Sequence, residues 1–108
     1  MRPVVLSVTG VGSSAVDPLD HYLKPFNVSL AVRVTGTITY TVQYTYDDVF
    51  AVGYTPASGN WVDHPSLTAQ TATKDSNIAY PVRAVRLTTS AGSGTATLTV
   101  IQAGGGGL

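Results

Sequence analysis

The sequence predicts an all-β fold, namely a single-domain antiparallel β-sandwich or small barrel of roughly five to eight strands with little helix. First, residues 36–46 alternate Thr or Gln with apolar or aromatic side chains, which is the period of a β-strand. Second, the chain has fifteen Thr and no Glu, so residues that favour strands replace those that favour exposed helices. Third, its 108 residues are the usual size of one domain.

The N-terminal third contains two predicted strands separated by a long loop. Residues 4–9 form the first strand, and the glycine-rich residues 10–14 end it as a turn. Residues 17–20 (Asp-Pro-Leu-Asp) could start a single helical turn, which Pro25 stops before a helix of ordinary length forms. The second strand covers residues 26–35, where Val and Leu alternate with smaller or polar side chains.

The strand predicted after Gly36 has two different faces. Gly36 separates it from the preceding strand, either as a tight turn or as a bulge in one continuous bent strand. One face is apolar and aromatic: Ile38, Tyr40, Val42, Tyr44 and Tyr46. The other face carries no charge: Thr37, Thr39, Thr41, Gln43 and Thr45. We expect the aromatic face to lie in the core, an interpretation favoured over a platform on which sugars or bases stack.

The middle of the chain has weaker periodicity. Asp47 and Asp48 are expected to end the strand by capping local backbone amides, in preference to binding Ca²⁺ with another aspartate. Residues 51–54 are predicted as a further short strand, and residues 56–60 as a turn. Residues 68–77 are polar and mixed, which fits either one edge strand or a loop.

The C-terminal part predicts a β-hairpin and a tail. Residues 82–89 and 95–102 read as strands, and the glycine-rich residues between them read as the hairpin turn. Residues 104–108 (Gly-Gly-Gly-Gly-Leu) have few side chains to bury, so we expect a flexible tail. The predicted organisation is therefore one β domain over residues 1–103, followed by the tail at 104–108.

Few residues could support catalysis or bind a metal. The two Asp-His pairs, at residues 20–21 and 63–64, are sequence neighbours, and neighbours on a strand point to opposite faces. Residues 10–14 lack the lysine of a P-loop, and no nucleophile elbow occurs. We therefore expect no catalytic residue, no metal and no cofactor, and the protein is predicted not to be an enzyme.

Charge and cysteine content narrow the expected partners. The formal net charge is zero and no block of Lys or Arg occurs, so nucleic-acid binding is not expected. The absence of Cys excludes disulfides and thiolate chemistry. The apolar run at residues 4–6 is too short for a signal peptide or a membrane helix, so a soluble chain made in the cytoplasm and independent of membranes is expected.

A protein–protein interface is the expected functional feature. An uncharged Thr face without a gatekeeping Lys or Pro is open to edge pairing, and assembly on a larger body would cover it. The lone Trp is either a core anchor or an interface hot spot. Arg83 and Arg86 lie on opposite faces of the strand predicted at residues 82–89, so at most one can point toward the core. The other is a candidate for contact with a carboxylate of another molecule. The candidate interface residues are Thr37, Thr39, Thr41, Gln43, Trp61, Arg83 and Arg86.

Three segments together resemble small structural proteins encoded by tailed bacteriophages. They are residues 34–48, Trp61 with His64 and Pro65, and residues 80–87 leading into 94–102. The resemblance implies a virion component, made in the host cytoplasm, that binds the major capsid protein or other virion proteins and forms a homo-oligomer. A decoration or cement protein of the head is the first expectation, and a head-tail or tail-associated protein is the nearest alternative. A carbohydrate-binding module that uses Tyr40, Tyr44, Tyr46 or Trp61 is the alternative from another class.

Overall fold

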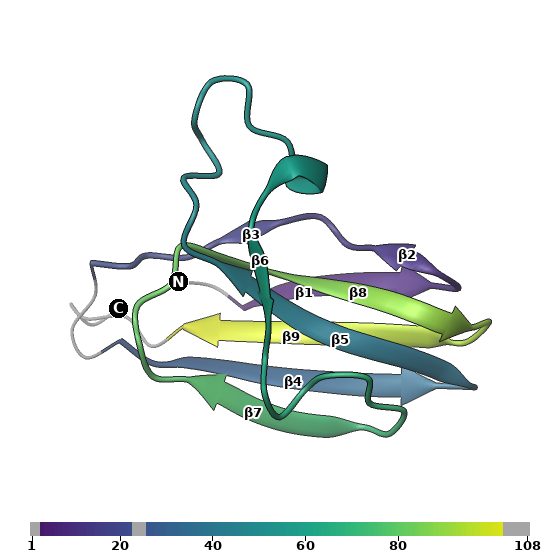
Figure 1. Ribbon diagram of the computed structural model, residues 1–108. Helices are drawn as coiled ribbons and strands as arrows, with labels where there is room; N and C mark the ends of the chain where they lie inside the picture. The colour runs from purple at the N-terminus through teal and green to yellow at the C-terminus, as the bar shows by residue number, and fades with distance from the viewer. Residues whose placement is uncertain (1–2, 23–25, 103–108) are drawn as a thin grey trace.

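The computed structural model describes residues 3–22 and 26–102, which form two antiparallel sheets packed face to face (Figure 1). The first sheet contains, in spatial order, β1 (Val4–Thr9), β9 (Thr95–Gln102), β4 (Val28–Thr35) and β7 (Lys74–Ile78). The second contains β2 (Gly12–Ser13), β8 (Ala84–Gly92), β5 (Ile38–Thr45) and β6 (Trp61–Asp63), with β3 (Asp17–Pro18) also paired to β8. The predicted all-β sandwich is confirmed. The predicted tail at residues 104–108 lies outside the described residues.

The core lies between the two sheets and follows the period of two in the sequence. On β5, Ile38, Tyr40 and Val42 are fully buried, as the alternation predicted. Tyr46 belongs to the same predicted face, but the strand ends one residue before it and its side chain is 57% exposed. The Tyr40 hydroxyl donates to the Ala72 carbonyl oxygen at 2.8 Å, so this buried polar group is satisfied.

The predicted C-terminal hairpin is wrong. β8 pairs with β5 in one sheet, whereas β9 pairs with β1 and β4 in the other, so the chain crosses between sheets after Gly92. The connection from β4 to β5 crosses in the same way, and Gly36 is a turn there, with φ of 78°, rather than a bulge in one strand. The two crossings contact each other, because the Gly94 amide donates to the Thr37 carbonyl oxygen at 2.8 Å.

The helical turn predicted at residues 17–20 is also wrong. Asp17 and Pro18 form β3 on the edge of a sheet, where a proline costs no ladder hydrogen bond on its solvent side. The Leu19 amide then donates to the Arg83 carbonyl oxygen at 2.8 Å. Tertiary hydrogen bonds to β8 thus outweigh the weak local signal for a helix.

The connection from β5 to β6 projects beyond both sheets (Figure 1). The short strand predicted at residues 51–54 is wrong, because turns occupy this stretch: the Ala51 amide donates to Asp48 and the Tyr54 amide to Ala51, each at 3.1 Å. A 3₁₀ turn at Pro56–Ser58 follows, inside the predicted turn region. Within the described residues, no helix is long and apolar enough to cross a membrane.

The polar stretch from residue 68 to 77 contains both of the predicted possibilities. Residues 74–78 form the edge strand β7, while the preceding residues run as a loop beside β5. There Tyr40 and Gln70 exchange backbone hydrogen bonds of 2.9 Å in both directions. The loop therefore covers the part of β5 that β6 does not reach.

Candidate functional site

The predicted Thr face lies on the outside of the β2–β8–β5–β6 sheet. Thr37 is exposed and Thr39, Thr41 and Gln43 are half-buried, whereas Thr45 is fully buried. The expectation of an open pairing edge is wrong, because β5 is bounded by β8 on one side and by β6 and residues 64–70 on the other. This face therefore presents side chains rather than free backbone groups to its surroundings.

Three of the predicted interface residues meet in one row on this outer face. Gln43 Nε2 donates to Asp63 Oδ1 at 2.7 Å, and Arg86 Nε donates to Gln43 Oε1 at 2.9 Å. The Arg86 guanidinium carbon lies 4.3 Å from the centre of the Trp61 ring. The row Asp63–Gln43–Arg86–Trp61 thus links three neighbouring strands, and Gln43 holds both of its charged side chains by one hydrogen bond each.

Trp61 is a half-buried anchor rather than an open stacking surface. Its Nε1 donates to the Pro56 carbonyl oxygen at 3.0 Å, which ties the 3₁₀ turn to β6. Arg86 covers one face of the ring, and partial burial lowers the pKa of this guanidinium from its ordinary value. A sugar could therefore stack only on the part of the Trp61 ring that Arg86 does not cover.

Arg83 stands apart from this row, immediately before β8. Its Nη1 lies 3.9 Å from Asp48 Oδ2, and both side chains are about half exposed (41% and 54%), so the pair contributes little to stability. The predicted capping of local backbone amides is confirmed for Asp48, whose Oδ1 accepts from Phe50 N at 3.0 Å. Asp47 instead accepts from a distant amide, Asn60 N, at 2.7 Å.

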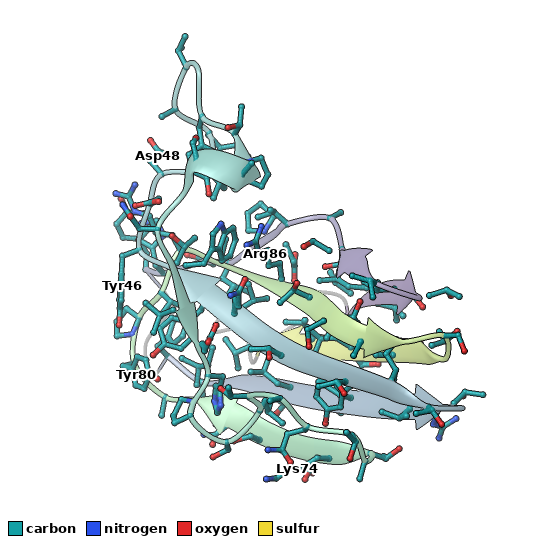
Figure 2. All side chains as sticks on the ribbon, turned by 45° about the vertical axis from the view of Figure 1, so that its right-hand side comes forward. Tyr46, Asp48, Lys74, Tyr80 and Arg86 are labelled. Carbon is teal, nitrogen blue, oxygen red and sulfur yellow. The ribbon has the colours of Figure 1, made fainter. Side chains whose placement is uncertain are left out.

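The tyrosines of β5 belong to the core, as expected. Tyr40 and Tyr44 are buried, and the Tyr80 hydroxyl donates to the Tyr44 hydroxyl at 3.0 Å. This hydrogen bond and burial raise the pKa of Tyr44 to about 12. Tyr46 and Tyr80 flank Tyr44 with edge-to-face rings, and Figure 2 shows both at one end of the sandwich. Of the three tyrosines considered for sugar binding, only Tyr46 is exposed.

The buried histidine has a structural role. His64 is buried; its Nδ1 accepts from Ser66 N at 3.1 Å, so Nε2 carries the proton and donates to the Asn77 carbonyl oxygen at 2.9 Å. Across residues 3–22 and 26–102, no three His, Cys, Asp or Glu side chains gather as metal ligands would.

Two surface features escaped the sequence analysis. The projecting segment 46–60 exposes Phe50 (79%) and Val52 (106%). The outer face of the other sheet carries its own Thr rows, in which the Oγ1 atoms of Thr9 and Thr95 lie 3.0 Å apart. The alternation of residues 95–102 could have revealed these rows, but nothing in the sequence distinguishes an exposed Val-Phe-Ala-Val run from a short strand.

Comparison with family models, with curated proteins and with solved structures found no match to this chain.

Replacing Gln43 with alanine should lower the free energy of unfolding by about 0.5–1 kcal/mol and shift the fluorescence of Trp61. The substitution removes both hydrogen bonds that hold Arg86 and Asp63, so the guanidinium loses its fixed position over the indole ring. Urea denaturation followed by the single Trp measures both effects. Thr39→Ala is the matched control, since Thr39 lies on the same face and makes no side-chain hydrogen bond to a described residue. Equal effects in both variants would contradict a role for the row.

Proposed function

We propose that the protein is a non-enzymatic structural component of a tailed-bacteriophage virion, a decoration protein that binds the assembled shell. The observation that carries the proposal is the outer face of the β2–β8–β5–β6 sheet, where Gln43 hydrogen-bonds both Asp63 and Arg86 and Arg86 lies over the Trp61 ring. Burying isolated charge is expensive, and on this face Asp63 and Arg86 have opposite charges and each keeps a hydrogen bond to Gln43, which lowers the cost of desolvating them.

The rest of this face is polar but uncharged. Ser13 and Thr41 lie on either side of Thr88 in the sheet, and the Ser13 hydroxyl donates to Thr88 Oγ1 at 3.2 Å. Short hydroxyl side chains lose little rotamer freedom on contact and can exchange hydrogen bonds with a partner's polar groups. The resemblance of residues 34–48 and 80–87 to phage structural proteins supports a virion as the larger body.

Co-sedimentation with expanded capsids of the phage that carries the gene tests the proposal. The protein should bind intact shells, and Thr39→Lys should weaken binding at least tenfold, because it buries an unpaired ammonium at the contact. Thr39 is preferred to Thr41, whose Oγ1 accepts a hydrogen bond from Ala69 N at 3.0 Å and therefore supports the fold.

The control is Val11→Lys, which adds the same charge at an exposed position (68%) before β2 and should leave binding unchanged. Binding to isolated tails or connectors instead of shells would favour the head-tail alternative. If the parent protein binds no virion part, the proposal fails.

A further inference from the structure

The projecting segment 46–60 exposes apolar side chains at its tip and has a fixed conformation, as expected of a loop that docks into another surface. Phe50 and Val52 are 79% and 106% exposed, and the only charged residues of the segment are Asp47 and Asp48. Its shape is held by internal hydrogen bonds, among them Asn60 N to Asp47 Oδ2 at 2.7 Å. An apolar tip that is already ordered loses little entropy when it docks.

A groove on the opposite sheet has complementary features. It has a volume of about 580 Å³, and it is lined by Ala31, Val32, Arg33, Thr73, Lys74, Asp75, Thr97 and Thr99. Arg33 and Lys74 outweigh Asp75, so its formal charge is +1, against −2 for segment 46–60, in which Asp48 also lies 3.9 Å from Arg83 of its own chain. None of these three charged side chains forms an ion pair with another described residue. Because a cavity of roughly 150 Å³ accommodates a benzene ring, the groove has room for the side chains of the tip.

The segment and the groove of one chain cannot meet. Figure 2 places Asp48, at the base of the projecting segment, and Lys74, at the groove, on opposite sides of the molecule. The groove also lies on the outer face of β4, β7 and β9, whereas the segment emerges from the sheet that contains β5. A contact between the two features therefore requires two molecules.

We propose that the tip of segment 46–60 inserts into the β4–β7–β9 groove of a second copy of this chain. Phe50 and Val52 cover the groove floor at Ala31 and Thr97, while the aspartates approach Arg33 and Lys74. The two contacting surfaces differ, so a pair of copies still has one free tip and one free groove, and the association continues into a filament or closes into a ring. This inference goes beyond shell binding, because it concerns contacts between copies and uses neither Thr39 nor the row at Gln43.

Disulfide trapping tests the contact directly, because the chain contains no cysteine of its own. Ala51→Cys combined with Thr97→Cys should give, under mild oxidation, a ladder of covalent dimers, trimers and larger species on a non-reducing gel. Ala51 is exposed at the tip, so Phe50 and Val52 stay intact. The control pairs Ala51→Cys with Val11→Cys, an exposed site outside the groove, and should give at least tenfold less product. Equal yields from the two pairs would overturn the proposal.

A mixing experiment tests the head-to-tail geometry. Phe50→Ser/Val52→Ser removes the tip, and Ala31→Glu/Arg33→Glu blocks the groove. All four positions are exposed, so both variants should fold as the parent does. In sedimentation velocity each variant alone should be monomeric, whereas an equimolar mixture should form heterodimers that grow no further. Parent-like association of either variant alone, or a mixture that stays monomeric, would overturn the proposal. Shell binding of these variants is measured separately, so failure of either idea is distinguishable from failure of the other.

Discussion

Replacing Gly92 with alanine should lower the free energy of unfolding by at least about 3 kcal/mol. Gly92 has a φ of 101°, which L side chains rarely adopt. A Cβ atom there would also lie 2.8 Å from Ile38 Cα and closer still to the Thr37 carbonyl oxygen. Thr37 ends the neighbouring crossing and Ile38 begins β5, and both contacts are with backbone atoms, so no side-chain rotation can relieve the clash.

The matched control is Gly53→Ala in the projecting segment. Gly53 has a comparable φ of 81°, but an added Cβ would meet nothing within 4 Å. We expect a loss of only about 1–2 kcal/mol, which is the cost of the backbone conformation alone. Urea denaturation followed by Trp61 fluorescence compares the two variants. If both lose the same free energy, contact between the two crossings does not contribute to the stability of the sandwich.

The glycines near residue 92 show why the hairpin prediction failed. A tight hairpin and a crossing between sheets both need glycine between two alternating strands, so the local sequence of residues 82–102 fits either. The choice between the two depends on contacts distant in sequence. Gly94 N donates to the Thr37 carbonyl oxygen at 2.8 Å, and Gly10 N donates to the Gly94 carbonyl oxygen at 3.0 Å. Periodicity reports which face of a strand is buried, and it does not report which strand lies beside it.

The same limit applies to the candidate site. Alternation correctly placed Thr39 and Gln43 on an outer face, because that statement depends only on the pleat. The odd and even numbering of Arg83 and Arg86 also predicted that their side chains lie on opposite faces of the strand. It could not predict that Arg86 lies over Trp61, because this contact joins β8 and β6 across β5. Residues 64–70 form hydrogen bonds with the backbone of β5 along the edge that β6 does not reach. Their sequence has no strand periodicity, so this pairing could not be predicted.

Asp17 is the one buried acid among the described residues, and the helical turn predicted there gave no indication of its burial. Asp17 lies opposite Val85 in the β3–β8 pair, so its side chain points to the same side as a fully buried core residue. Its Oδ2 atom is buried and has no hydrogen-bond partner among the described residues. Burial raises the pKa of this carboxyl from 3.8 to about 6. Asp17 therefore destabilises the fold at neutral pH, where ionisation is easier in the unfolded chain.

Replacing Asp17 with asparagine should raise the free energy of unfolding at pH 7 by about 1–2 kcal/mol, a value reduced by solvent screening near the edge strand β3. Below about pH 4 the carboxyl is protonated in both the folded and the unfolded chain, so its burial does not lower the free energy of unfolding. As the pH rises from about 4 to about 6 the unfolded chain ionises first, so the parent loses stability over this window, and above it the loss is constant. Urea denaturation from pH 3 to pH 8 should show this decline in the parent and in Asp75→Asn, an exposed carboxyl on β7, but not in Asp17→Asn. If the Asp17→Asn curve runs parallel to that of the parent, the buried carboxyl is not the cause of the decline.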